Sequence, residues 1–426
     1  MLSALPHHPA ASAFTRTVSS SALVLALFLT SCSGENMTAP ATPPPPPPNT
    51  PPPKTSAPLQ FAAVSAGSSS TCGVTTRGAA YCWGGNTSGA LGNGTVNGAS
   101  TIPVPVSGGL TFATVSVGES HACAVTTAGT AYCWGANYGG ELGNGTTTSS
   151  ATPVLVSGGL AFTSVSAGYL HTCGLTTGGT AYCWGTNDYG ESGADTTATV
   201  ITTPAPVSGG LTFAQVSAGA RHTCGVTIRG AAYCWGLNAS GELGNGTTTG
   251  PQQCSLPSGF SSPCSRIPVA VADDVSFARV NGGFDVTCAA ATNGAAYCWG
   301  YNGAGALGNG TTADSPIPAQ VSGGLTFATV SPGFGEFHSC GLTTGGAAYC
   351  WGDNYSGELG TGTSTSSTTP VLVSGGLTFA QVSAGYRHTC GVTTEGVAYC
   401  WGDNYWGALG IGNYTDAPSP TPVLGP

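Results

Sequence analysis

The chain has 426 residues, of which 68 are glycine and 30 are proline, so helix-interrupting residues are too frequent for a helical bundle or a coiled coil. Only 6% of the residues are charged and 40% are hydrophobic, which supplies enough apolar material for a core and excludes general disorder. The 8 basic and 17 acidic residues give a net charge of −9, which opposes the phosphate neutralisation on which nucleic-acid binding depends.

A targeting segment is expected over residues 1–31. The apolar run over residues 18–30 is too short to span a bilayer comfortably and suits a signal peptide. The stretch Leu-Thr-Ser-Cys that ends at Cys32 resembles a bacterial lipobox, which implies cleavage before Cys32 and a lipid on its sulfur. An exported, lipid-anchored protein of the cell envelope is therefore expected, and Ser33 in place of Asp favours the outer membrane or cell surface. The alternative is an ordinary secretory signal followed by an unrelated cysteine.

Residues 32–58 are predicted to be a linker between this anchor and the folded domain. Their composition is dominated by Pro, Thr, Ala and Ser, and six consecutive prolines occupy positions 43–48. Such a tract favours the extended polyproline II conformation and acts as a spacer. The alternative is a ligand for a proline-recognising module.

Residues 59–426 contain a sequence repeat with a period near 50. The segment Ala-Tyr-Cys-Trp-Gly occurs seven times, with tryptophans at Trp83, Trp134, Trp184, Trp235, Trp299, Trp351 and Trp401. A repeat of this period marks one supersecondary unit that stacks against its neighbours, and propeller blades are the main β candidates. The sequence therefore predicts an all-β fold, a seven-bladed β-propeller.

Each repeat contains four predicted strands, A to D, which the third copy illustrates. Strand A begins at Phe162, strand B at His171, strand C contains Trp184 and strand D begins at Pro204, each with apolar and polar residues alternating. The connection from D to A is short and that from C to D is long, so we expect D, A, B and C to form one four-stranded antiparallel blade. The C-terminal strand, residues 420–424, would then pair with the first blade and close the ring.

Cysteines ten residues apart recur on strands B and C. A short turn joins these strands, so the two cysteines face each other at a separation that a disulfide can bridge. A further pair lies in an insertion over residues 246–268, which it would staple into a protruding finger, and Cys32 alone is left over. Metal binding is the competing interpretation, but zinc sites favour two to four residues between cysteines. The expected pairs are Cys72–Cys82, Cys123–Cys133, Cys173–Cys183, Cys224–Cys234, Cys254–Cys264, Cys288–Cys298, Cys340–Cys350 and Cys390–Cys400.

The repeated segments Gly-x-x-His, Tyr-x-Trp-Gly and Asn-x-x-Gly-x-Leu-Gly resemble those of the regulator of chromosome condensation repeat family. The resemblance covers residues 61–426 and implies a seven-bladed propeller. Copies one and five depart from the pattern, with Ser70 and Val286 in place of the histidine, and copy three has Ser192 in place of the leucine. The eponymous member is known for guanine-nucleotide exchange. The family also includes a secreted propeller that inhibits β-lactamases, which implies that the fold works outside cells.

The two faces of the predicted propeller differ. The A–B and C–D loops share one face, which we call the variable face, and the near-invariant B–C and D–A turns share the other. Aromatic and arginine residues on a rigid scaffold favour binding, although the alternative is that part of them pack over neighbouring loops. The linker enters from the opposite face, so the variable face would point away from the membrane. The candidate binding residues are Tyr138, Tyr169, Leu170, Tyr189, Arg221, Phe284, Asp285, Tyr301, Phe334, Phe337, Tyr355, Tyr386, Arg387, Tyr405 and Trp406.

Motifs for catalysis are not evident in the sequence. The five repeated histidines share one structural register on different blades, too far apart to ligate one metal, and are interpreted as hydrogen-bonding residues of the blades. The asparagines that precede the loop glycines are interpreted as architectural. No phosphate-binding loop, nucleophile elbow or calcium loop occurs, so no cofactor, metal or catalytic residue is predicted.

The resulting hypothesis is a surface-anchored, non-catalytic interaction module that displays its variable face to a protein ligand. A glycan ligand is an alternative. An enzyme with a site on the propeller axis is another, and would have to draw on Glu119, Asp285 and Glu336, which belong to different blades. Guanine-nucleotide exchange is disfavoured, because the predicted export separates this chain from cytosolic GTPases.

Overall fold

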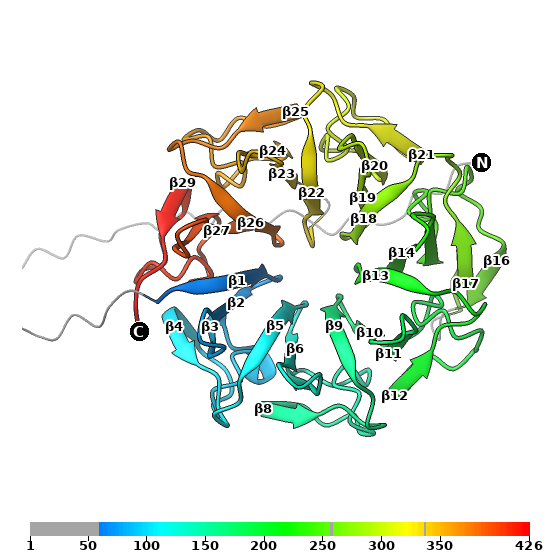
Figure 1. Ribbon diagram of the computed structural model, residues 1–426, viewed down its shortest axis with the longest axis horizontal. Helices are drawn as coiled ribbons and strands as arrows, with labels where there is room; N and C mark the ends of the chain where they lie inside the picture. The colour runs from blue at the N-terminus through cyan, green and yellow to red at the C-terminus, as the bar shows by residue number, and fades with distance from the viewer. Residues whose placement is uncertain (1–58, 256–258, 336–337) are drawn as a thin grey trace, which may run out of the picture. The chain divides into compact units, whose positions relative to one another are not determined.

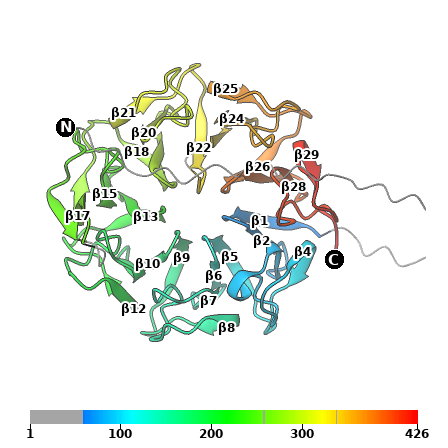
Figure 2. The same cartoon turned by 180° about the vertical axis from the view of Figure 1, so that it is seen from behind.

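A computed structural model describes residues 59–255, 259–335 and 338–426, which form seven antiparallel sheets arranged around a central axis (Figure 1 and Figure 2). The predicted targeting segment, Cys32, the linker up to residue 58 and Phe337 lie outside the described residues. Within the described part, no helix is long and apolar enough to cross a membrane.

The sheets radiate from the axis, and each follows the chain order from an inner strand A outward to strand D. The inner strands begin with a buried phenylalanine and contact one another around the axis. They are β1 (Phe61–Ala66), β5 (Phe112–Val117), β9 (Phe162–Ala167), β13 (Phe213–Ala218), β18 (Phe277–Gly282), β22 (Phe327–Pro332) and β26 (Phe379–Ala384). The B strands are β2 (Ser70–Thr75), β6 (His121–Thr126), β10 (His171–Thr176), β14 (His222–Thr227), β19 (Val286–Ala291), β23 (His338–Thr343) and β27 (His388–Thr393).

The C strands carry the repeated tryptophan and the D strands form the outer edge. The C strands are β3 (Ala80–Gly85), β7 (Ala131–Gly135), β11 (Ala181–Thr186), β15 (Ala232–Leu237), β20 (Ala296–Gly300), β24 (Ala348–Gly352) and β28 (Ala398–Gly402). The D strands are β4 (Ala99–Pro105), β8 (Ser150–Leu155), β12 (Val200–Pro206), β17 (Ser261–Ala270), β21 (Ser315–Gln320), β25 (Ser367–Leu372) and β29 (Ala417–Pro422). One 3-10 turn, η1 (Thr87–Gly89), lies in the first C–D loop.

The prediction of a propeller with seven antiparallel blades is confirmed, but the assignment of strands to blades was wrong. In the first sheet the order is β1-β2-β3-β4, so the long C–D loop lies within one blade and the short D–A turn crosses to the next. The C–D loop is long because it reaches the neighbouring blade before returning. Leu91 from the first loop packs there against Trp134 and Phe112 of the second blade.

The junction of the last and first blades is also corrected. The C-terminal strand β29 pairs with β28 in the last blade and does not join the first sheet. It still contributes to closure, because Ala417 and Val423 share a core cluster with Phe61 and Trp83 of the first blade. The ring therefore closes through side-chain packing and interblade hydrogen bonds, without a strand shared between blades among the described residues.

The core consists of clusters between neighbouring blades rather than one central core. The seven repeated tryptophans are at most 1% exposed, and each packs beside a phenylalanine that begins an inner strand, as Trp235 does beside Phe213. Each of the eight expected cysteine pairs is a disulfide, and the cysteines have no exposed surface. The seven disulfides between strands B and C join directly opposed residues, so they tie each hairpin together inside these clusters.

The insertion in the fourth repeat forms a β-hairpin at the edge of its blade. Its first arm, β16 (Gln252–Ser255), pairs with β17 as a fifth strand, and the disulfide between Cys254 and Cys264 links the two arms. Cys264 lies opposite Leu237, the last residue of β15, so the preceding residues of β17 extend beyond that strand toward the variable face. The insertion, which was expected to protrude, therefore adds a fifth strand to its blade and also extends beyond the neighbouring strand.

Candidate functional site

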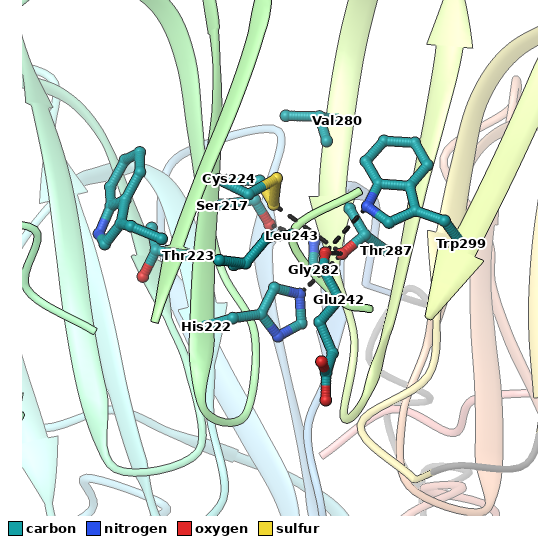
Figure 3. Close-up of a disulfide and its surroundings, with 12 residues drawn as sticks. Ser217, His222, Thr223, Cys224, Glu242, Leu243, Val280, Gly282, Thr287 and Trp299 are labelled. Carbon is teal, nitrogen blue, oxygen red and sulfur yellow. Dashed lines mark hydrogen bonds between the residues drawn. A yellow bond between two sulfur atoms is a disulfide. The ribbon is translucent and has the colours of Figure 1, made fainter. Parts of the chain in front are cut away.

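The histidines connect neighbouring blades through a repeated hydrogen-bond network (Figure 3). His222 Nε2 lies 2.8 Å from the hydroxyl of Thr287 in the next blade, and that hydroxyl donates to the main-chain carbonyl of Glu242 at 2.8 Å. Trp299 Nε1 donates to the same carbonyl at 2.8 Å. The same arrangement joins His121 to Thr172, His171 to Thr223, His338 to Thr389 and His388 to Thr71. The interpretation of these histidines as hydrogen-bonding residues is confirmed.

This network fixes the tautomer of each histidine. The threonine hydroxyl has one proton and donates it to the carbonyl, so it accepts a hydrogen bond from His Nε2–H. Burial lowers the pKa of His121, His222 and His338 to about 4, and that of His171 and His388 to about 3. The histidines are therefore neutral near pH 7 and act as structural donors.

The two copies without histidine have changed on both sides of the junction. Where Ser70 replaces the first histidine, the position of the partner threonine in the next blade is Ala122. Where Val286 replaces the fifth, the partner position is Ser339, whose hydroxyl still donates to the carbonyl of Ala306 at 3.0 Å. At the first junction, where Ala122 has no hydroxyl, the absence of the histidine avoids leaving a buried histidine N–H without an acceptor.

Replacing Thr223 with valine is expected to destabilise the propeller by about 1 to 3 kcal/mol, because the N–H of His171 would lose its acceptor in a buried site. Urea unfolding followed by tryptophan fluorescence would measure the loss. The control is Thr223→Ser, which keeps the hydroxyl and should lose less. Equal stability of the two variants would contradict a role for the hydroxyl.

The C–D loops are held by their asparagines, as the sequence predicted. Asn238 Oδ1 accepts the N–H of Leu243 at 3.0 Å, and the side-chain amide donates to the carbonyl of Thr247 at 2.9 Å. The other six asparagines accept the equivalent N–H at 2.8 to 3.0 Å. These bonds place the buried loop leucines against the next blade, except in the third copy, where buried Ser192 takes this position.

Four of these loops bury a glutamate beneath the variable face. Glu141, Glu191, Glu242 and Glu358 are 0 to 3% exposed, and each accepts a main-chain N–H from the residue two positions earlier. Burial raises the pKa of Glu191 and Glu242 to about 8 and that of Glu358 to about 7. The nearby carboxylate of Asp285 contributes to the shift at Glu242.

A ring of glycines surrounds the axis where the inner strands turn into the A–B loops. Tyr169 N–H donates to the carbonyl of Gly219 in the next blade at 3.1 Å, and Ala220 N–H donates to Gly283 at 2.8 Å. A Cβ atom on Gly168 would lie 2.4 Å from the carbonyl oxygen of Gly219, so this approach requires glycine. The ring consists of Gly67, Gly118, Gly168, Gly219, Gly283, Gly333 and Gly385.

The A–B loops bring several predicted binding residues together over this ring. Tyr169 and Phe284, from the third and fifth blades, make an edge contact with ring centroids 5.7 Å apart. The Arg221 guanidinium lies 5.3 Å from the Phe284 ring and 5.9 Å from the Tyr189 ring. Glu119 accepts a hydrogen bond from the Tyr169 hydroxyl, and burial raises the pKa of Glu119. These side chains pack on one another and form a cluster that we call the central cluster.

A second group of predicted residues is exposed around it. Tyr138 is 74% exposed, Tyr355 is 80% exposed and Tyr405 is 72% exposed. Trp406 is 46% exposed and its ring centroid lies 5.1 Å from that of Tyr405. Of the remaining predicted residues, Leu170, Asp285, Tyr301, Phe334 and Tyr386 are half-buried and Arg387 is exposed beside the Tyr386 ring.

Two hollows meet at Tyr405 and Trp406. One has a volume of about 400 Å³ and is lined by Tyr386, Arg387 and Asp403 as well as this pair. The other has a volume of about 500 Å³, and its lining includes the pair, Asn97 and Tyr414. The aromatic pair therefore forms a ridge between two depressions, where the last blade adjoins the first.

The variable face is strongly acidic, a feature that counting the A–B loops alone missed. Apart from the four buried glutamates, its loops carry eight acidic residues against two arginines among the described residues. The acids are Glu119, Asp188, Asp195, Asp285, Asp314, Asp353, Asp403 and Asp416, and the arginines are Arg221 and Arg387. The turns of the opposite face carry Arg77, Arg229, Asp273, Asp274 and Glu395. The C–D loop sequences contained this signal, which appears once both loop sets are placed on one face.

Within the described part of the chain, no group of three His, Cys, Asp or Glu residues is arranged to hold a metal ion. Glu119 and Asp285, two of the acids considered for an axial enzyme site, lie in the A–B loops of the second and fifth blades, and Glu336 lies outside the described residues.

A comparison of the sequence with models of known protein families identifies the family of the chain. The RCC1-like domain matches residues 33–334, and regulator of chromosome condensation (RCC1) repeats match residues 345–392 and 379–407. The chain belongs to the RCC1-like domain family. The resemblance seen in the repeated motifs is thereby confirmed.

Two relatives in this family are larger proteins. The ultraviolet-B receptor UVR8 of Arabidopsis thaliana is 29% identical over 297 residues, which are 69% of this chain and 65% of the receptor. The human E3 ubiquitin-protein ligase HERC2 is 29% identical over 321 residues, 73% of this chain and 6% of the ligase. The chain thus spans less than two thirds of the length of either relative.

Solved structures share the fold at lower identity. Human WBSCR16 superposes with a TM-score of 0.70 and 20% identity, covering 81% of this chain and 94% of that one. Prp20p from Saccharomyces cerevisiae superposes with a TM-score of 0.68 and 20% identity, covering 86% and 87%. These likenesses show that the propeller fold is shared.

Proposed function

We propose that this RCC1-like propeller is an exported, lipid-anchored interaction module whose variable face binds a protein with a positively charged contact surface, without catalysing a reaction. The observation that carries the proposal is the exposed pair Tyr405 and Trp406 on an acidic face. In the same family of folds, the structure of Prp20p is described together with its binding to Gsp1p and histones, which supports a role in protein binding.

The chemistry of the ridge suits lysine and arginine side chains. A cation over the face of an aromatic ring is attracted by the ring, and a nearby carboxylate adds a charged partner. Asp403 lines the hollow beside Trp406, so both kinds of group border one depression, which Arg387 also lines. An incoming basic side chain would there contact an aromatic surface and a carboxylate together.

The proposed location rests on the cysteines. Eight disulfides suit an oxidising compartment, since thiols are kept reduced in the cytosol. The proposed anchor is Cys32. Mass spectrometry of the protein from its native membranes should find a lipid on Cys32 and no free thiols, whereas an intact N-terminus with reduced cysteines would overturn export.

Replacing Tyr405 and Trp406 together with alanine is expected to weaken partner capture by about 30-fold or more, as for a binding hot spot. Both side chains are exposed, so thermal stability should change little. The assay is cross-linking of the purified full chain to native cell envelopes, followed by identification of the captured protein and measurement of its affinity for each variant.

The matched control is Ile228→Ala, which truncates a side chain that is 67% exposed on the opposite face and should leave capture unchanged. Because the face is acidic, raising the salt concentration should slow association with the partner. Retained capture by the double variant would contradict the proposal. Loss of binding after glycosidase treatment of the envelopes would indicate a glycan ligand instead.

A further inference from the structure

The inner strands enclose an axial channel whose polar side chains connect the blades. Ser65 Oγ accepts the N–H of Val117 at 3.0 Å, and Ser383 Oγ accepts the N–H of Ala66 at 3.0 Å. Ser331 makes the equivalent bond to Ala384 at 3.1 Å. These hydroxyl groups accept from the backbone, and their own protons donate to no group among the described residues, so they are available to a molecule in the channel.

One side of this channel forms a cavity of about 460 Å³, which the fifth, sixth, seventh, first and second blades line. Its polar lining includes the three serines, Thr329, Gln381 and Arg279. Arg279 is the single charged residue among the lining side chains. Its guanidinium makes no ion pair or hydrogen bond with the residues that the structure describes.

No structural role in the propeller is evident for Arg279. The equivalent positions of the other inner strands are Ala63, Thr114, Ser164, Gln215, Thr329 and Gln381, all uncharged. Gln381 bonds to both backbone groups of Val64 in the next blade, at 3.0 and 2.9 Å. On β18 the contact to the next blade is made instead by Asn281, whose amide donates to the carbonyl of Val330 at 2.6 Å.

We propose that this axial cavity binds a small oxyanion, a phosphate or a carboxylate, with Arg279 as its charged partner and the serine hydroxyls as further donors. A guanidinium presents N–H groups in a planar fork that matches two oxygens of such an anion. The cavity lining supplies these donors and includes no carboxylate that would repel the ligand. The site lies on the axis and is separate from the ridge proposed to bind protein.

Titration of the full chain with inorganic phosphate tests the proposal. The sequence has seven arginines, so the NMR spectrum of arginine Nε–H groups is sparse, and the signal missing from Arg279→Gln assigns Arg279. Glutamine is tolerated at this register, as Gln215 and Gln381 show. At constant ionic strength, phosphate should shift the Arg279 signal with a saturable curve and raise the melting temperature, and Arg279→Gln should abolish the rise.

Arg77→Gln removes a charge from the opposite face and should keep the phosphate effect. A parallel titration with acetate shows whether the site takes a carboxylate, a phosphate or both. Saturation by either anion supports the site. A failure of both anions to shift the Arg279 signal with a saturable curve would overturn it. Equal stabilisation of the Arg279→Gln variant would overturn it as well.

Discussion

Replacing Gly168 with alanine is expected to destabilise the propeller by about 2 kcal/mol or more. The new Cβ would lie 2.4 Å from the carbonyl oxygen of Gly219, which belongs to the backbone of the next blade and cannot swing aside. Relief requires the two blades to separate at the axis, where the N–H of Tyr169 bonds to that same carbonyl at 3.1 Å. Denaturant unfolding would measure the loss as a lower midpoint.

A glycine in the same blade provides the control. Gly178 lies in the B–C turn with no atom within 4 Å of an added Cβ, and its backbone is accessible to alanine. Gly178→Ala should therefore change the free energy of unfolding by less than about 1 kcal/mol, and a small stabilisation is the expected direction. If Gly168→Ala were equally harmless, the close approach of the inner strands would not limit the ring.

Stability is expected to peak near pH 6.5 and to fall on both sides, for different reasons. The five buried histidines have a pKa of about 3 or 4 in the folded protein, below the unfolded value of 6.5. The unfolded chain therefore binds more protons as the pH falls below 6.5, and the stability that neutral histidine provides is lost. A protonated ring would also carry an Nδ1–H, and Nδ1 of His222 and His338 has no hydrogen-bond partner among the described residues.

The buried glutamates act in the opposite direction. Their folded pKa, about 8 for Glu191 and Glu242 and about 7 for Glu358, lies above the unfolded value of 4.5. The folded state therefore binds more protons between these values, and stability falls as the pH rises through this window. Below pH 6.5 the five histidines outweigh these three acids, whereas above it the acids act alone.

Glu242→Gln separates the two effects. Glutamine stays neutral and can still accept the N–H of Ser240 with its carbonyl oxygen, so the variant should gain about 2 kcal/mol or more at pH 8 and little at pH 4. Urea unfolding midpoints at pH 4, 6.5 and 8 would measure the loss of stability on the acidic and on the basic side of the maximum. A constant gain at all three pH values would contradict ionisation as its cause.

The sequence predicted the number of blades correctly, but it did not predict which four strands form each blade. Seven tryptophan segments at nearly constant spacing establish the number of blades, and opposed cysteines follow from the short B–C turn. Loop length did not reveal which strands share a sheet. That depends on contacts distant in sequence, such as the hydrogen bond from Trp134 to the carbonyl of Ala90, which draws the long loop against the next blade.

The candidate site was predictable in composition but not in arrangement. Alternation of strands and loops placed the aromatic residues on one face, yet no local pattern distinguishes Tyr169, which packs against Phe284, from Tyr405, which is exposed. Those two packed residues belong to blades that are not neighbours, and only the convergence of the A–B loops on the axis brings them together. The acidity of the face likewise emerges only when the loops of several blades are combined.

The gap between Pro426 and Leu59, the first described residue, is flanked by the same hydrogen bonds as an ordinary turn between blades. Val423 and Leu424 N–H bond to Ala398 and Gly410, as Val106 and Ser107 bond to Ala80 and Gly92 in the first D–A turn. Phe61 bonds to Gly396 as Phe112 bonds to Gly78.

Six residues separate β4 from β5, and six would separate β29 from β1 if Pro426 were joined directly to Leu59. Since no sheet is shared between blades within the described residues, the order of blades along the chain is arbitrary. A circular permutant opened at any other D–A turn would rebuild the same ring, and its two ends would again lie on the face opposite the aromatic ridge.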